Sequence, residues 1–109
     1  MARHSSPDDT FVEYVCDQIA ALDGISHRSM FGGFGLYCGS TFFGIAYRGR
    51  LYLKTDEESR TKYIEWEMEP FQANAKQSLR SYYEVPEDCL DDAERLAELA
   101  DEAIGIAAR

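Results

Sequence analysis

The stretch from 30 to 54 constrains the fold of this chain more than any other part of it. Glycines separate short aromatic and aliphatic runs in MFGGFGLYCGSTFFGIAYRGRLYLK. Such runs are typical of β-strands, and strands joined by tight glycine-containing turns are antiparallel. Apolar side chains alternate with Gly and Tyr, which indicates a sheet with one covered face and one nearly open face. The expected strands are 34–37, 42–47 and 51–54.

Helix signals flank this stretch. A serine and a proline at Ser6-Pro7 predict the start of a helix that ends at Gly24, where the glycine would adopt the left-handed C-cap. A capping-box pattern with Thr55 as the cap predicts a second helix, which would end near Glu67. A similar pattern predicts a last helix over about 91–108.

Two weaker strand patterns, at 71–75 and 79–85, complete the expected elements. The segment 25–30 is short and mixed, and it fits either an edge strand or an extended connector. The expected order is α-β-β-β-α-β-β-α. The predicted fold is therefore α+β, a two-layer sandwich of an antiparallel sheet with helices on one face. A single domain is expected over 10–109, behind a flexible N-terminal tail at 1–9.

The net charge of −9 is unevenly distributed along the chain. Residues 1–54 hold five basic and five acidic side chains, whereas 55–109 hold six basic and fifteen acidic ones. An acidic half repels phosphate, so direct nucleic-acid binding is not expected. Three widely spaced cysteines without a C-x-x-C pair indicate reduced thiols, and neither a signal peptide nor a membrane span is visible. The predicted location is cytoplasmic.

The sequence contains no pattern of catalytic residues. The glycine-rich run at 31–35 lacks the spacing and the lysine of a phosphate-binding loop, and a strand rather than a helix follows it. His4 and His27 have no Cys or His at ligand spacing, which argues against a metal site. No Ser or Cys is identifiably paired with a base. We therefore predict no catalytic residue, no metal and no cofactor, and we do not expect an enzyme.

Four segments together resemble the N-terminal domain of the TfoX (Sxy) family. They are R-x-M-F-G-G-F-G-L-Y at 28–37, L-Y-L-K-T-D at 51–56, P-F at 70–71 and Y-Y-E-V-P-E at 82–87. The resemblance spans 10–108 and implies an α+β sandwich similar to that of secretion chaperones. One departure is Glu67, where the family would place a glycine at the end of the second helix.

The resemblance also carries functional expectations. Full-length TfoX proteins are bacterial competence regulators that act as coactivators with the cyclic-AMP receptor protein, and they carry a second, C-terminal domain. This chain ends at Arg109, so a stand-alone single-domain member is expected. The implied function is a non-catalytic regulatory or adaptor role in transcription regulation, exerted through protein–protein contacts by a homodimer. The partner itself does not follow from the sequence.

The strand tyrosines and the glycine-rich segment provide the candidate surface. Some tyrosines must face away from the helices, and an exposed aromatic sheet face is typical of an interaction patch. RNA-binding sheets also use aromatics but need a basic surround, so protein contact is favoured. The alternative is a small-ligand-binding or enzymatic domain with a pocket near the glycine-rich segment. The candidate interaction surface comprises Arg28, Met30, Phe31, Gly32, Gly33, Phe34, Tyr52, Tyr82 and Tyr83.

Overall fold

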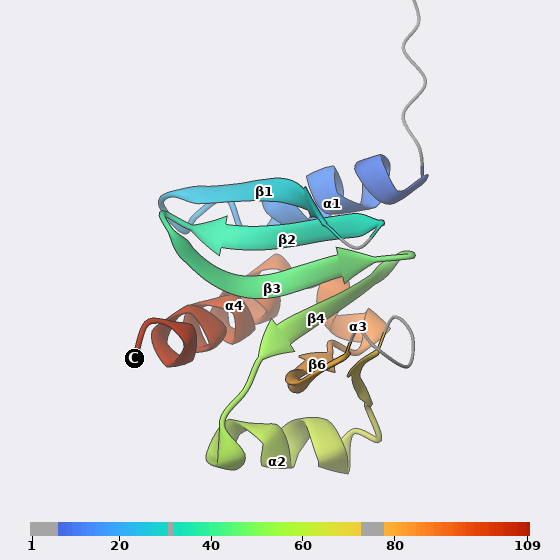
Figure 1. Cartoon of the computed structure of the whole chain (residues 1–109), viewed down its shortest axis with the longest axis vertical. Coiled ribbons are helices and arrows are strands. Elements are labelled where there is room, and N and C mark those ends of the chain that lie inside the picture. The colour runs from blue at the N-terminus through green and yellow to red at the C-terminus, as the bar shows by residue number, and fades with distance from the viewer. Residues whose placement is uncertain (1–6, 31, 73–77) are drawn as a thin grey trace, which may run out of the picture.

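The structure, a computed structural model, describes residues 7–30, 32–72 and 78–109 (Figure 1). In these residues six strands form one antiparallel sheet with the order β1-β2-β3-β4-β6-β5. The elements are α1 (Pro7–Gln18), β1 (Ile25–Met30), β2 (Gly33–Cys38), β3 (Thr41–Tyr47), β4 (Arg50–Lys54), α2 (Glu57–Glu65), β5 (Pro70–Gln72), β6 (Ser78–Glu84), α3 (Glu87–Leu90) and α4 (Ala93–Ala107).

The predicted fold class is confirmed, and two elements are added to the predicted order. The segment 25–30 is the edge strand β1 rather than a connector, and the short helix α3 follows the last strand. The first helix ends at Gln18 instead of running to Gly24, because the backbone continues in tighter turns; the N–H of Leu22, for example, donates to the carbonyl of Ile19 at 3.0 Å. Gly24 has the expected positive φ of 81°. Residues 7–9 lie in α1, and 1–6 of the predicted tail lie outside the described residues. Of the predicted strand 71–75, residues 71 and 72 lie in β5, and 73–75 lie outside the described residues.

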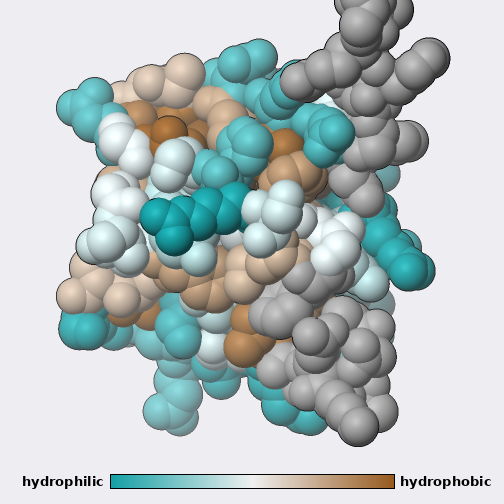
Figure 2. All heavy atoms as spheres, turned by 45° about the horizontal axis from the view of Figure 1, so that its top comes forward, coloured by the Kyte–Doolittle hydropathy of each residue, from teal (hydrophilic) through white to brown (hydrophobic). Residues whose placement is uncertain are grey.

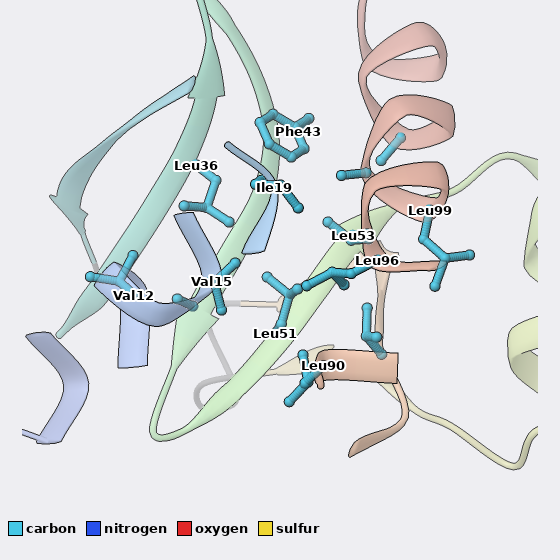
Figure 3. Close-up of a cluster of buried hydrophobic side chains, with 14 of the residues drawn as sticks. Val12, Val15, Ile19, Leu36, Phe43, Leu51, Leu53, Leu90, Leu96 and Leu99 are labelled. Atoms are coloured by element: carbon cyan, nitrogen blue, oxygen red, sulfur yellow. The ribbon is translucent and has the colours of Figure 1, made fainter. Parts of the chain in front are cut away.

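The main core lies between the sheet and the helices α1 and α4, which cover one of its faces (Figures 1 and 3). Side chains at alternate positions of β2 and β4 point toward these helices, as expected for strands with one buried face. Each large apolar side chain buried here contributes about 1.5–3 kcal/mol. The fully buried side chains of this core include Val12, Val15, Ile19, Leu36, Phe43, Leu51, Leu53 and Leu96.

A second, smaller cluster lies on the other face of the sheet, which the sequence predicted to be nearly open. It consists of Ile45, Tyr52, Phe71 and Tyr82. Phe71 on β5 is 1% exposed, and its ring lies 5.1 Å from that of Tyr52, centroid to centroid. The pairing of β5 with β6 shifts register next to Phe71, so this short strand departs from a regular ladder. The last two strands therefore cover part of this face.

Helix α2 begins one residue later than predicted. Asp56 is the N-cap: its carboxylate accepts the backbone N–H of Ser59 at 2.8 Å, and the Ser59 hydroxyl accepts the N–H of Asp56 at 3.0 Å. Thr55, the predicted cap, is buried instead and donates its hydroxyl to the carbonyl of Ser81. The bond from Ser59, followed by the guanidinium of Arg109, lowers the pKa of Asp56 to about 2.

The end of α2 is closed by two bonds of the Schellman type. The N–H of Glu67 donates to the carbonyl of Ile64 at 2.9 Å, and the N–H of Met68 donates to that of Tyr63 at 3.0 Å. This geometry places Glu67 in the left-handed region with a φ of 63°. The family resemblance expects a glycine at this position, and the backbone conformation explains why. None of the helices in the described residues is long and apolar enough to cross a membrane.

Candidate interaction surface

The β1–β2 hairpin presents the motif at 28–37 as two alternating sets of residues. Phe34 and Leu36 pack against the core under the helices. The intervening positions of β2, and the residues paired with them on β1, therefore lie on the opposite face, which we call the open face. Figure 2 turns the top of Figure 1, where β1 lies, toward the viewer, and hydrophilic side chains lie there between hydrophobic patches. The pairs on the open face are Ser26 with Tyr37, Arg28 with Gly35, and Met30 with Gly33.

A continuous line of side chains crosses the open face from the edge strand to β6. We call it the aromatic row, and it consists of Arg28, Tyr37, Phe42, Tyr82 and Lys54. The guanidinium carbon of Arg28 lies 5.2 Å from the Tyr37 ring centroid, and the next two centroid distances are 5.4 and 5.1 Å. The Nζ of Lys54 lies 5.3 Å from the Tyr82 centroid. Each such contact contributes about 0.5–1.5 kcal/mol, so the row is held in one arrangement before any partner binds.

Two rings of the aromatic row each contact two neighbours. Tyr37 on β2 lies between Arg28 on β1 and Phe42 on β3. Phe42 in turn lies between Tyr37 and Tyr82, with interplanar angles of 38° and 28°. The row is therefore a chain of ring contacts whose two ends are cationic side chains.

The glycines of the motif are explained by the packing of the open face. A Cβ atom on Gly35 would clash with the Sδ of Met30 and would lie 3.1 Å from the Phe42 ring. A Cβ atom on Gly33 would lie 2.5 Å from the carbonyl oxygen of Ala46 on the neighbouring strand. Only glycine lets these side chains and this backbone approach so closely. The motif therefore builds one end of the aromatic row.

The charge of the sheet contrasts with the charge of the whole chain. Residues 25–54 contain four Arg and Lys side chains and no Asp or Glu, although the chain carries a net charge of −9. Within the six strands the single acidic side chain is Glu84, and it pairs with Arg50 at 3.4 Å. Both ends of the aromatic row therefore carry a positive charge on a sheet with almost no acidic side chains.

The phenol of Tyr82 stays neutral through the physiological pH range. Burial, followed by the neighbouring Tyr37, raises the pKa of Tyr82 to about 12. Its hydroxyl donates to the carbonyl oxygen of Phe42 at 3.3 Å, which fixes the ring beside that strand. Burial, followed by the charge of Glu84, also raises the pKa of Tyr52. The open face therefore gains no negative charge from these tyrosines.

The family model of the TfoX N-terminal domain matches residues 17–107, which include all six strands and α4. The chain belongs to the TfoX N-terminal domain family. No curated protein matches the chain. In this TfoX N-terminal domain, the segment that carries the resemblance at 28–37 is the segment that builds the β1–β2 hairpin and one end of the aromatic row.

The structure divides the predicted surface residues between the two faces of the sheet. Arg28, Met30, Tyr52 and Tyr82 lie on the open face, with Gly33 beneath them and Gly32 in the turn at a φ of 81°. Phe34 and Tyr83 belong to the helix-side core instead. Phe31 lies outside the described residues.

Sequence reasoning left Tyr37, Phe42 and Lys54 out of the predicted surface. Strand alternation with Gly35 would have placed Tyr37 on the open face. Alternation could not place Phe42, because the pairing of β2 with β3 shifts register between Leu36 and Tyr37.

Four clefts in the described part of the molecule lie away from the glycine-rich segment. The one with the greatest volume of the four, about 810 Å³, is lined in part by Arg50, Tyr52 and Glu84. Another, of about 600 Å³, lies between α2 and α4. The other two measure about 540 and 480 Å³; the first lies beside α3 at the start of α4, and the second lies between α4 and the end of α1. The alternative hypothesis of a ligand pocket near 31–35 gains no support from these four clefts.

Proposed function

We propose that this TfoX N-terminal domain is a non-catalytic regulatory or adaptor module that binds a protein partner through the open face of its sheet. The observation that carries the proposal is the aromatic row, in which Tyr, Phe, Arg and Lys side chains form one ordered line on a face that α1 and α4 do not cover. Tyr, Phe and Arg are the residue types enriched at protein interfaces. Pre-ordered side chains also lose less entropy on binding.

Two of the cysteine thiols support a non-catalytic role. Burial, followed by the charges of Asp17 and Glu13, raises the pKa of the Cys16 thiol, whereas a nucleophilic cysteine needs a lowered pKa. The Cys38 thiol donates to the carbonyl of Asp23. These groups serve packing and backbone bonding rather than nucleophilic attack.

The geometry of the aromatic row favours a protein partner over a nucleic acid. Single-stranded nucleic acids bind by stacking their bases on free aromatic faces. In the aromatic row the Arg28 guanidinium lies over the Tyr37 ring, and Phe42 stacks on Tyr82. Homodimer formation, a cytoplasmic location and a role in competence stay predictions, of which sedimentation tests the first.

Site-specific photo-cross-linking tests the proposed function. A benzoylphenylalanine replaces Tyr37 on the open face or, as a matched control, Ile64, which is 56% exposed on α2. In the cell of origin, we expect protein cross-links at 37 that exceed those at 64 several-fold and that excess unmodified chain competes away. Equal cross-linking at both positions, or cross-links to nucleic acid alone, would refute the proposal.

A further inference from the structure

We propose that the partner docks as an added β-strand on the free edge of β1, and that it is an extended acidic segment with a carboxylate opposite Arg28. The proposal rests on the proposed function, and it names the chemistry and the binding mode of the partner. Addition of a strand to a sheet edge provides affinity through main-chain hydrogen bonds and specificity through alternate side chains.

The two edges of the sheet differ in how well they are protected. The β5 edge has three residues, begins with a proline and has an irregular register. The β1 edge has six residues in continuous register with β2, without Pro, Lys or a bulge, and its side chains from 26 to 29 are exposed. Natural sheets usually protect their edges with such devices. Arg28 is the one Arg or Lys on β1, so an added strand has to supply the opposite charge there.

The outward backbone groups of β1 can be assigned from its register. The N–H of Gly39 donates to the carbonyl of Gly24 at 2.9 Å, and hydrogen-bonded pairs alternate along an antiparallel ladder. The pairs that include 26, 28 and 30 are thus the hydrogen-bonded ones. Ile25, His27 and Ser29 direct their N–H and C=O groups away from β2, and in the described residues β1 pairs with β2 alone. Three residues are therefore available to bond an added strand.

This assignment also places Arg28 where it can favour an acidic residue in the added strand over a basic one. In an added antiparallel strand, the residue opposite Arg28 occupies a non-hydrogen-bonded site, in which facing side chains approach most closely. The guanidinium already lies over the Tyr37 ring, an arrangement that leaves its N–H edge free for a carboxylate. Met30 lies two positions further along on the same face, so the residue opposite it in the added strand should be apolar. A fitting antiparallel segment therefore has an apolar residue and, two positions later in its chain, an acidic one.

Charge also decides between this segment and a second copy of the chain as the occupant. A two-fold pairing of β1 with β1 centred on its middle would bring the two Arg28 side chains close together, with no acidic residue from 25–54 beside them. Like charges close together on a sheet are destabilising. A segment that supplies the missing carboxylate is the better match.

Nuclear magnetic resonance titration of the ¹⁵N-labelled full chain tests the proposal. The probe is the peptide acetyl-Thr-Val-Thr-Glu-Thr-Ser-amide, and the matched peptides replace its Glu by Lys or methylate alternate backbone nitrogens. We expect the Glu peptide to shift the amide signals of Ile25, His27 and Ser29 and to slow their hydrogen exchange. It should bind about five-fold more tightly than the Lys peptide, and one of the two methylation registers should abolish binding.

Two charge reversals sharpen the test. Arg28→Glu should reverse the preference between the Glu and Lys peptides. Arg48→Glu changes the charge equally, and Arg48 also lies 5.2 Å from a tyrosine centroid, but it lies in the β3–β4 turn and should leave the preference unchanged. The peptide comparisons on the unaltered chain remain decisive if a variant fails to fold.

Several results would overturn the docking mode. They are equal binding of the two charged peptides, no binding of either, signal shifts confined to the helices, or β1 amides already protected by a second copy in the absence of peptide. If cross-links at position 37 identify a protein partner while β1 stays unprotected, the docking mode fails and the proposed function stands. If no protein cross-links form there, the proposed function itself fails.

Discussion

Glu67→Gly should stabilise this domain, because Glu67 holds the left-handed conformation with a φ of 63° at the end of α2. An L-residue in that conformation costs about 1–2 kcal/mol. The greater freedom of glycine in the unfolded chain offsets roughly 0.5–1 kcal/mol of this gain. The net expectation is a gain of about 0.5–1 kcal/mol in the free energy of unfolding, or a Tm about 2–4 °C higher.

Urea unfolding followed by circular dichroism measures this gain, and Glu67→Ala is the matched control. Alanine removes the same negative charge from an acidic chain but keeps a Cβ atom in the left-handed conformation. Backbone strain predicts that the alanine variant is no more stable than the parent chain. If alanine stabilises as much as glycine, charge repulsion rather than backbone strain is the cause. A glycine variant with an unchanged or lower midpoint would refute the reasoning altogether.

Three further predictions follow from the packing and the charges. Gly33→Ala should lower the free energy of unfolding by about 1–3 kcal/mol in the same urea assay, because its Cβ atom meets a backbone carbonyl rather than a movable side chain. Phe71→Ala should cost about 3–5 kcal/mol, as a core residue does, although it lies outside the main core; a cost below 1 kcal/mol would contradict the second cluster. Asp56→Asn should make the stability of the domain less dependent on pH in the acid range. Ser59 and Arg109 lower the pKa of Asp56, so its contribution to stability is present above about pH 4 and is lost as the pH falls toward 2. Urea midpoints measured at several pH values test this.

The strands could be predicted where turns and periodicity agree. Glycines mark the turns after β2 and β3, and Gly39 and Gly49 adopt the positive φ that such turns require. The fold class follows from this pattern because tight turns leave few topologies open. The ends of the helices were predicted less accurately. The predicted and observed N-caps of α2 differ by one residue because Thr55 and Asp56 are both good N-cap residues, and the hydrogen bond of Thr55 to Ser81 decides between them.

The composition of the open face could not be predicted, for two physical reasons. A register shift between β2 and β3 pairs Leu36 with Gly44 but Tyr37 with Phe42, which breaks the two-residue alternation. In addition, β5 is a three-residue strand whose Phe71 packs across the face onto Tyr52, a contact that no local pattern encodes. Long-range packing, rather than local propensity, thus determines which part of the face is covered.

The motif at 28–37 serves packing and surface chemistry through the same register. Shifting β1 by one residue against β2 would move Arg28 from the open face to the helix side. The glycines beneath the aromatic row keep that register, because the space above Gly35 is filled by Met30 and Phe42. Glycine variants therefore alter stability and surface together. Only charge reversal at an exposed side chain such as Arg28 separates the two roles, which is why it is the decisive substitution for the proposed interaction.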